Sequence, residues 1–256
     1  MTVEIIGDKV YRASGTWSNQ IHKFLNFLHI NGFVKVPKAL GFDNQNREIL
    51  TFVPGENYDY PLPENAISSE ALVSSAKLLR SYHDVAQKFL ESSEYRHNTW
   101  MFQAIDPKQV ICHNDFAPYN ICFKERKAVG IIDFEAAIPG PRTWDIAYAL
   151  YRFAPFTNPK NDDGFGEITE QTSRACLFLD CYGLANEERT NLVELIIKRL
   201  EALVGFLIES AEKGNPKYLQ NLQDQHHLKY LEDIEYIKKH KKAIQACLLT
   251  KNYKHI

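Results

Sequence analysis

The sequence lacks the cysteine patterns of a disulfide framework or a zinc ribbon. It holds five cysteines in 256 residues, an odd number, and none of them forms a C-x-x-C pair. Small disulfide-stabilised domains and zinc ribbons need paired cysteines at fixed spacings, so the pattern argues against both. No basic and apolar leader opens the chain. Together with the unpaired cysteines, this predicts a cytoplasmic, reduced protein.

Long apolar runs and a one-sided charge are also absent from the sequence. No run approaches the roughly 20 apolar residues that a helix needs to cross a bilayer. The 30 Lys and Arg residues are balanced by 32 Asp and Glu residues, which gives a formal net charge of −2. Such a balance creates no field that favours nucleic acid or an anionic membrane, so neither is expected as a partner.

The first 56 residues predict a small, strand-rich lobe. Two hairpins are expected in it, with a helix between them. The strands of these hairpins are expected at residues 3–6 and 9–12, and at residues 40–42 and 48–53. The helix is expected to have Ser18 as its N-cap and to end before Asn31.

The remaining residues, 57–256, predict a larger and mostly helical lobe. The segment that connects the two lobes contains Pro61 and Pro63, which forbid a helix and discourage a central strand. A long helix is expected to open at residues 68–70, and helical periodicity dominates from about Gly166 onward. The pattern therefore predicts an α+β protein with two unequal lobes.

Residues 110–135 combine polar side chains in a pattern that fits catalysis. Apolar residues flank the polar turn 124–127 on both sides, so two short strands are expected to pair there. Asn120 would enter the first strand and Asp133 would leave the second, which brings two oxygen ligands together. Asp115 lies on the loop just before Asn120, within reach of the same point.

This arrangement suits magnesium-dependent chemistry on a hydroxyl group. Magnesium prefers oxygen ligands and takes only one or two carboxylates, while water and substrate phosphates complete its shell. Asp115 would stay available to accept a proton, an effect typically worth about 10²–10⁴-fold in rate. Each residue alone, His113 included, is more often structural, because Asp and Asn are common in turns and caps. The combination of all of them is what favours a function.

The stretch 113–120, His-Asn-Asp-Phe-Ala-Pro-Tyr-Asn, resembles the H-x-D-x-x-x-x-N catalytic loop of the aminoglycoside phosphotransferase and choline kinase families. These families are relatives of the protein kinases, and residues 132–135 resemble their metal-binding segment. The resemblance continues in their L-x-x-L-H helix, their lobe hinge and their G-D-P-x-x-D-L-A segment, which are similar to residues 78–83, 49–56 and 140–147. It implies a bilobal protein-kinase-like fold with a reduced β-rich N-terminal lobe.

The resemblance also implies roles for individual residues. Asp115 would be the catalytic base, and Asn120 and Asp133 would bind Mg²⁺. His113 would position the loop rather than transfer protons, and Asp145 would anchor it. The implied reaction is the transfer of phosphate from ATP to a hydroxyl of a small molecule, such as an aminoglycoside, choline or a sugar.

The implied nucleotide site departs from the family pattern. Adenine is expected to contact backbone groups of the hinge at Thr51, Phe52 and Val53. Arg12 stands at the strand position where the family has a Lys, and its guanidinium can grip phosphate with two donors. The following helix has no carboxylate where the family has the Glu that pairs with that Lys. Glu4 and Glu48 both remain open as partners of Arg12.

These departures leave two alternatives to a kinase. A nucleotide-binding pseudokinase with a scaffold or regulatory role would explain the reduced small lobe. It would have no use, however, for a complete set of Asp115, Asn120 and Asp133. A magnesium-dependent hydrolase would use the same carboxylates to pass phosphate to water.

Overall fold

The computed structural model describes residues 3–96, 99–161 and 165–249, and the chain divides into two compact units. The first unit comprises residues 1–145, and the second comprises residues 146–256. Helix α4, Arg142–Phe153, runs across this division. The lobe boundary expected near residue 56 lies inside the first unit and stays a prediction.

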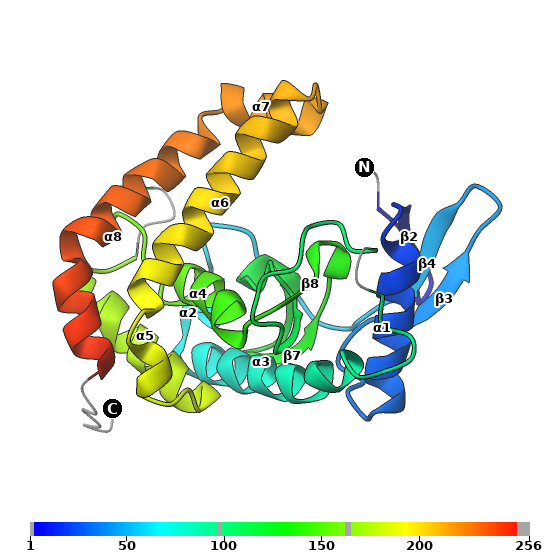
Figure 1. The fold of residues 1–256 in the computed structure, drawn as a ribbon, viewed down its shortest axis with the longest axis horizontal. Helices are drawn as coiled ribbons and strands as arrows, with labels where there is room; N and C mark the ends of the chain where they lie inside the picture. Colours follow the sequence, from blue (N-terminus) through cyan, green and yellow to red (C-terminus); the bar gives the residue numbers. More distant parts are fainter. Residues whose placement is uncertain (1–2, 97–98, 162–164, 250–256) are drawn as a thin grey trace. The chain divides into compact units, whose positions relative to one another are not determined.

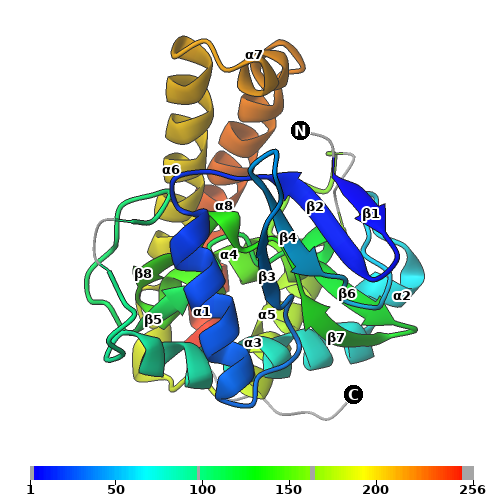
Figure 2. The same ribbon diagram turned by 90° about the vertical axis from the view of Figure 1, so that its right-hand side faces the viewer.

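A four-stranded antiparallel sheet and helix α1 open the first unit (Figure 2). The strands follow the order β1 (Glu4–Ile6), β2 (Lys9–Ala13), β4 (Arg47–Thr51) and β3 (Ala39–Phe42). Both expected hairpins are confirmed, although β4 ends at Thr51 rather than at Val53. The register of β2 and β4 places Arg12 directly opposite Glu48.

Helix α1 spans Ser18–Ile30 and is followed by Asn31, as the sequence predicts. Its buried face carries apolar residues at helical spacing: Ile21, Phe24, Leu25 and Leu28. The expectation that Ser18 is the N-cap is wrong, because Trp17 holds that position without a side-chain cap. The Ser18 hydroxyl oxygen instead accepts the backbone N–H of Gly15 at 3.0 Å, which stabilises the turn before the helix.

The rest of the first unit consists of helices and short strand pairs around the motif-bearing loops. Helix α2 (Glu64–Ile67) precedes α3 (Ser69–Phe89), which begins where the sequence predicts. Ser68 is the N-cap of α3, and its hydroxyl oxygen accepts the N–H of Ala71 at 3.2 Å. Strand β5 (Val110–Cys112) pairs with β8 (Ile138–Gly140), and both lie in the buried interior. The expected hairpin is confirmed as β6 (Ile121–Lys124) and β7 (Lys127–Ile131).

The segment after β4 joins the small sheet to the β6–β7 hairpin. Glu56 and Phe123 exchange two backbone hydrogen bonds of 2.8 and 2.7 Å. Gly130 lies so close to this segment that a Cβ atom there would be 2.4 Å from Cγ1 of Val53. The absence of a side chain at Gly130 therefore lets the hinge segment approach the hairpin.

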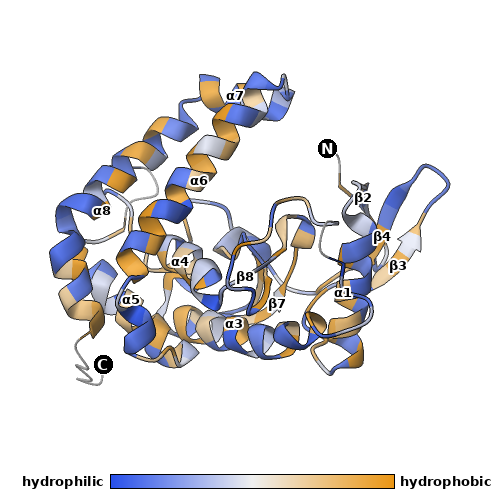
Figure 3. Ribbon diagram, viewed as in Figure 1, coloured by the Kyte–Doolittle hydropathy of each residue, from blue (hydrophilic) through white to orange (hydrophobic). Residues whose placement is uncertain are grey.

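The second unit is helical, as expected for the C-terminal third (Figure 1). Its helices are α5 (Ile168–Tyr182), α6 (Leu192–Glu212), α7 (Pro216–Gln223) and α8 (His226–Leu249). Helices α6 and α8 pack against each other, and α7 connects them. Hydrophobic and hydrophilic patches alternate along α6 and α8 (Figure 3), which is typical of helices that bury one face. Within the described ranges, no helix is both long and apolar enough to span a bilayer.

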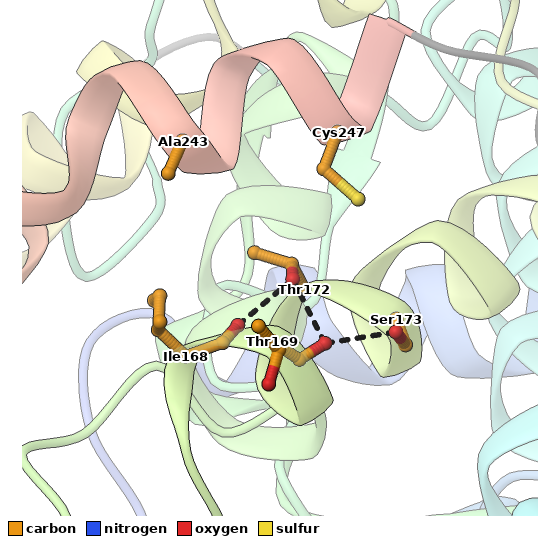
Figure 4. Close-up of a pocket in the computed structure, with 6 residues that line it drawn as sticks. All are labelled: Ile168, Thr169, Thr172, Ser173, Ala243 and Cys247. Carbon is orange, nitrogen blue, oxygen red and sulfur yellow. Dashed lines mark hydrogen bonds between the residues drawn. The ribbon is translucent and has the colours of Figure 1, made fainter.

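A cavity of about 310 Å³ lies between α5 and α8 in the second unit (Figure 4). Its lining consists of Ile168, Thr169, Thr172, Ser173, Ala243 and Cys247. The hydroxyl of Thr172 donates to backbone carbonyls of its own helix at Ile168 and Thr169, and the hydroxyl of Ser173 donates to the carbonyl of Thr169. The hydroxyl groups of these two residues are thus committed to the helix.

Candidate active site

The β6–β7 hairpin places Asn120 and Asp133 at its same end. Asn120 ends the short 3₁₀ helix η1 (Pro118–Asn120) directly before β6, and Asp133 follows β7. The N–H of Ile132 donates to the carbonyl of Asn120 at 2.9 Å, which closes the hairpin at this end. The juxtaposition expected from the sequence is therefore confirmed at the level of the backbone.

Asp115 makes direct contact with the side chains of this group. One carboxylate oxygen, Oδ2, accepts Nδ2 of Asn120 at 2.9 Å. The other, Oδ1, accepts the phenol hydroxyl of Tyr119 at 2.8 Å. Nδ2 of Asn120 also donates to the backbone carbonyl of Asp115 at 3.0 Å. The carboxylate is thus held by one donor on each oxygen.

These contacts fix which end of the Asn120 amide faces outward. Both acceptors of Asn120 belong to Asp115, and neither can donate a hydrogen, so the nitrogen must point toward them. The amide oxygen Oδ1 is turned the other way and accepts nothing from any residue that the structure describes. Oδ2 of Asp133 is likewise without a donor among the described residues. Two oxygen atoms are therefore available to a cation.

Asp133 has an uncommon, left-handed backbone conformation. Its φ of 64° and ψ of 66° lie in the left-handed region, which is uncommon for a residue other than glycine and is often found at ligand sites. Its side chain is 40% exposed. In the described part of the chain, no cluster of three or more His, Cys, Asp and Glu side chains could hold a metal ion. A pair of one carboxylate and one amide still fits magnesium, which needs few protein ligands when phosphates complete its shell.

A fully buried carboxylate, Asp145, anchors the loop that carries Asp115. Its Oδ2 accepts the backbone N–H of His113 at 2.7 Å and Nε2 of His83 at 3.0 Å. Its Oδ1 accepts the backbone N–H of Asn114 at 2.8 Å. Three donors therefore compensate the loss of water around this buried charge. The geometry is that of the structural anchor expected from the sequence.

The pKa values of Asp145 and His83 reflect this burial. Burial raises the pKa of Asp145, but the hydrogen bond from His83 and the backbone hydrogen bond from His113 outweigh it and leave the pKa lowered. Burial lowers the pKa of His83, and the opposing attraction of Asp145 does not restore it. Both shifts favour a charged carboxylate beside an uncharged imidazole at neutral pH.

His113 connects the loop that carries Asp115 to the segment that carries Asp133. Its Nδ1 accepts the N–H of Asp115 at 3.3 Å, so the ring hydrogen lies on Nε2, which donates to the carbonyl of Ile132 at 2.8 Å. Its ring also packs edge-on against Phe134 with centroids 4.7 Å apart. These contacts tie the loop before Asp115 to the backbone before Asp133, which fits the positioning role expected for His113.

Asn114, between His113 and Asp115, is held by its side chain. Nδ2 donates to the carbonyl of Ala136 at 3.0 Å, and Oδ1 accepts Nε1 of Trp144 at 2.9 Å. Its φ of 65° is again in the left-handed region. The loop therefore adopts its sharp turn because the backbone of Ala136 and the side chain of Trp144 both hold Asn114 there.

Arg12 links the small sheet to Asp133. Its Nε donates to Oε1 of Glu48 at 2.5 Å, and its Nη1 donates to Oδ1 of Asp133 at 2.5 Å. Glu48 is thus the partner of Arg12, and it in turn accepts Nε2 of His22 at 2.9 Å. Burial lowers the pKa of Arg12, but the charges of Asp133 and Glu48 outweigh burial and raise it. The guanidinium therefore stays charged.

The hinge residues expected to contact adenine lie at the end of β4. The N–H of Thr51 donates to the carbonyl of Lys38 at 2.9 Å, and the N–H of Phe52 donates to the carbonyl of Asp8 at 2.7 Å. These two donors are therefore already used within the chain. Neither contact involves the amide of Val53, and the binding of adenine by these three residues stays a prediction.

Sequence reasoning missed two residues of this group, His22 and Tyr119, and it left the choice between Glu4 and Glu48 open. His22 lies on α1, in the stretch where no carboxylate was found to pair with Arg12. The sequence feature that could have indicated His22 is a hydrogen-bonding side chain on the buried face of that helix. Tyr119 lies inside the catalytic motif, at a position that the motif leaves unspecified.

Comparisons with known sequences support these motifs. A model of the phosphotransferase enzyme family matches residues 87–175. The trifolitoxin immunity protein of Rhizobium leguminosarum bv. trifolii is 32% identical to this chain over 201 residues. That alignment covers 77% of this chain and 76% of the relative.

Solved structures resemble the chain over most of its length. An amicoumacin kinase has a TM-score of 0.63 and 12% identity, over 93% of this chain and 88% of its own. A proposed aminoglycoside phosphotransferase of Ralstonia eutropha has a TM-score of 0.59 and 15% identity, over 93% and 92%. A choline/ethanolamine kinase family protein of Mesorhizobium loti has a TM-score of 0.58 and 12% identity, over 95% and 89%. At such identities the likeness shows the fold, and the predicted protein-kinase-like fold is confirmed.

Proposed function

The chain belongs to the phosphotransferase enzyme family, and we propose that it transfers the γ-phosphate of Mg-ATP to a hydroxyl of a small molecule with Asp115 as the base. The family membership confirms the resemblance drawn from the catalytic loop, and with it the enzyme class of a small-molecule kinase. The nucleotide, the metal and the residue roles are the proposed part. An amicoumacin kinase of the same fold has been solved with AMP-PNP and Ca²⁺, which supports a nucleotide and a divalent cation as partners.

The observation that carries the proposal is the fixed orientation of the Asn120 amide. Asp115 holds the nitrogen of that amide, so the oxygen faces away from Asp115, and Asp133 follows β7 at the same end of the hairpin. A structural hydrogen-bond network would satisfy both ends of the amide within the chain. Here the oxygen of Asn120 and one oxygen of Asp133 have no donor among described residues, as expected for metal ligands.

Asp115 is placed to take the proton of the acceptor. In the proposed step, the hydroxyl oxygen of the acceptor forms a bond to the γ-phosphorus, and the bond from that phosphorus to the bridging oxygen of ADP breaks. The proton of the hydroxyl passes to the carboxylate of Asp115. Tyr119 and Asn120 hold this carboxylate by one hydrogen bond on each oxygen, so it is oriented before the acceptor arrives.

Asn120 and Asp133 would hold the magnesium ion through the two oxygen atoms described above. When bound, the ion neutralises charge on the phosphate oxygens during transfer. Arg12 presents a positive charge beside Asp133, where it can balance the phosphates of the nucleotide. The phosphates would thus meet positive charge from the ion and from Arg12.

The test of the catalytic role is the variant Asp115→Asn. An Asn can keep both contacts, since its oxygen accepts Nδ2 of Asn120 and its nitrogen donates to the hydroxyl oxygen of Tyr119. We expect kcat to fall by about 10²–10⁴-fold because an amide cannot take the proton. The measurement is transfer of labelled γ-phosphate to a panel of aminoglycosides, choline and sugars, with Mg-ATP binding measured in parallel.

Two outcomes would contradict this assignment. Unchanged turnover in Asp115→Asn would remove Asp115 as the base, and labelled phosphate found only on water in the wild type would indicate a hydrolase. The matched control is Asp133→Ala, which leaves Asp115 in place. It should make nucleotide binding independent of magnesium, and an unaltered magnesium titration would exclude Asp133 as a ligand.

A second candidate function is protection from a toxin, favoured by the 32% identity to the trifolitoxin immunity protein. In that case the acceptor is a hydroxyl of the toxin itself. Trifolitoxin-sensitive cells that express the wild type should survive the toxin, and cells that express Asp115→Asn should not. Protection by both would favour the pseudokinase alternative, in which binding rather than phosphorylation removes the toxin.

A further inference from the structure

A line of hydrogen-bonded side chains leads from helix α1 to Asp133. His22 donates to one oxygen of Glu48 at 2.9 Å, and Arg12 donates to the other at 2.5 Å. The same guanidinium reaches Asp133 through Nη1 at 2.5 Å. Building on the proposed function, we propose that Glu48 and His22 are positioning residues that hold Arg12 in the orientation in which it binds the phosphates of the nucleotide.

The first argument is the way the donors of Arg12 are distributed. Nε is taken by Glu48 and Nη1 by Asp133, while Nη2 donates to no residue in the described ranges. The side chain of Arg12 keeps 14% of its surface exposed, whereas that of Glu48 keeps 3%. The guanidinium is thus held at its inner edge and has a donor left for a phosphate oxygen, which is a strong acceptor for it.

The second argument is the burial of Glu48. The residue is only 2% exposed, and a carboxylate in such a place needs donors on its oxygens. Arg12 and His22 each supply one, on separate oxygens, so the carboxylate has one orientation that satisfies both. Because a guanidinium is planar, a bond that fixes Nε also fixes the plane of the remaining donors.

The third argument is that His22 is itself held from a second side. Its ring stacks on that of Phe42 in β3, with centroids 4.5 Å apart and an angle of 17° between the planes. His22 lies on α1 and is 8% exposed. It therefore couples helix α1 to the strand that carries Glu48, and this connection takes the place of a carboxylate on the helix.

The same strand supplies a matched control that lacks this burial. Arg47 forms ion pairs of 2.7 Å with Glu4 and with Asp43, and its side chain is 32% exposed. Glu4 lies on β1 and Asp43 lies in the turn between β3 and β4, and both pairs join an arginine to a carboxylate. Neither of these two ion pairs of Arg47 involves Asp133, Glu48 or His22. Exposed pairs of this kind contribute little to stability.

The experiment measures the Kd of Mg-ATP by titration calorimetry on the full chain, well below its unfolding temperature. Glu48→Gln and His22→Leu should each raise the Kd by about tenfold, the value of one charge-assisted hydrogen bond. His22→Gln restores a donor to Glu48 and should recover most of the affinity. Arg47→Gln should leave the Kd unchanged.

The outcomes separate this inference from the proposed function. If the wild type binds Mg-ATP and both Glu48→Gln and His22→Leu bind it equally well, the positioning role is wrong and the proposed function stands. A lower melting temperature with an unaltered Kd would likewise show a merely structural role. If the wild type binds no Mg-ATP at millimolar concentration, the ATP part of the proposed function fails as well. Should Glu48→Gln not fold, the comparison of His22→Leu with His22→Gln decides.

Discussion

Each unit of this protein is organised around one buried aspartate, and the two aspartates differ in what they hold. Asp145 in the first unit accepts two backbone N–H groups and His83. Asp233 in the second unit is 2% exposed and accepts the hydroxyl of Tyr151 at 2.8 Å. It also accepts the N–H of Asn158 at 2.7 Å and Nδ2 of Asn161 at 2.8 Å. In both units, a buried carboxylate thus holds a loop through hydrogen bonds.

The difference lies in the side chains that the ordered loop presents. The loop fixed by Asp145 leads to Asp115 and Asn120, where an amide oxygen is left without a donor in the described chain. In the loop fixed by Asp233, both asparagines direct donors back to the aspartate. A buried anchor therefore does not itself mark an active site. What marks one is an anchored loop whose acceptors are not all used within the fold.

Removing each aspartate gives the largest expected effect and tests this comparison directly. Asp145→Ala leaves three buried donors, on His83, His113 and Asn114, without their charged acceptor, and should lower the free energy of unfolding by about 1–3 kcal/mol for each. Asp233→Ala leaves neutral donors unsatisfied, at about 1–3 kcal/mol for each. Only Asp145→Ala should also abolish phosphoryl transfer under conditions where the protein remains folded.

The positions of the tryptophans allow the two units to be followed separately during urea unfolding. Trp17, Trp100 and Trp144 all lie in the first unit, so fluorescence reports that unit, while far-ultraviolet circular dichroism also reports the helices of the second. Asp145→Ala should shift the fluorescence midpoint most, and Asp233→Ala the dichroism midpoint. If both midpoints move together in both variants, the two units unfold as one and the comparison between separate anchors is lost.

An intermediate effect is expected from pH, and only at the first anchor. Burial lowers the pKa of His83 below its ordinary value of 6.5, so the unfolded chain takes up a proton there at a higher pH than the folded chain does. The free energy of unfolding should therefore fall as the pH drops below 6.5, by at most about 1.4 kcal/mol per pH unit for one proton. The pKa of Asp145 is also lowered in the folded protein. The free energy of unfolding should therefore fall further at more acidic pH, as the pH passes through this folded-state pKa and the carboxylate is protonated.

The measurement is the fluorescence-monitored urea midpoint at pH 7.5, 6.5 and 5.5, values chosen to span roughly the titration of an ordinary His. The variant His83→Gln, which does not titrate, should lose part of the wild-type pH dependence. An identical slope in the two proteins would mean that His83 is as easily protonated in the fold as in the unfolded chain.

Local signals predicted much of the fold and of the loop that carries the chemistry. The hairpins around Gly7 and around residues 124–127 follow from turn residues between apolar runs, and α3 follows from Ser68. The pairing of Asn120 with Asp133 followed because both belong to one hairpin, whose ends must meet. The roles of Asp115, Asn120, Asp133 and His113 remain predictions that the geometry fits.

The partner of Arg12 could not be predicted, because it depends on strand order and register. Strand β2 lies between β1 and β4, so Glu4 and Glu48 are both on neighbouring strands. The register sets Glu48 opposite Arg12 but sets Glu4 opposite Tyr11, one residue away and hence on the other face. Ser18 failed as an N-cap for a similar reason, since its hydroxyl was captured by the turn at Gly15.

The smallest effects come from one glycine in each unit, and they should have opposite signs. Gly130→Ala places a Cβ 2.4 Å from Cγ1 of Val53, a stiff side chain, and should destabilise the first unit by about 1–3 kcal/mol. Gly205 lies within α6, and a Cβ there meets nothing within 4 Å. Gly205→Ala should stabilise the second unit by about 0.5–1 kcal/mol, because alanine loses less backbone freedom in a helix. The fluorescence midpoint should fall in the first variant, and the dichroism midpoint should rise in the second. A gain in both variants would mean that the hinge segment at Val53 yields freely and does not depend on the missing side chain.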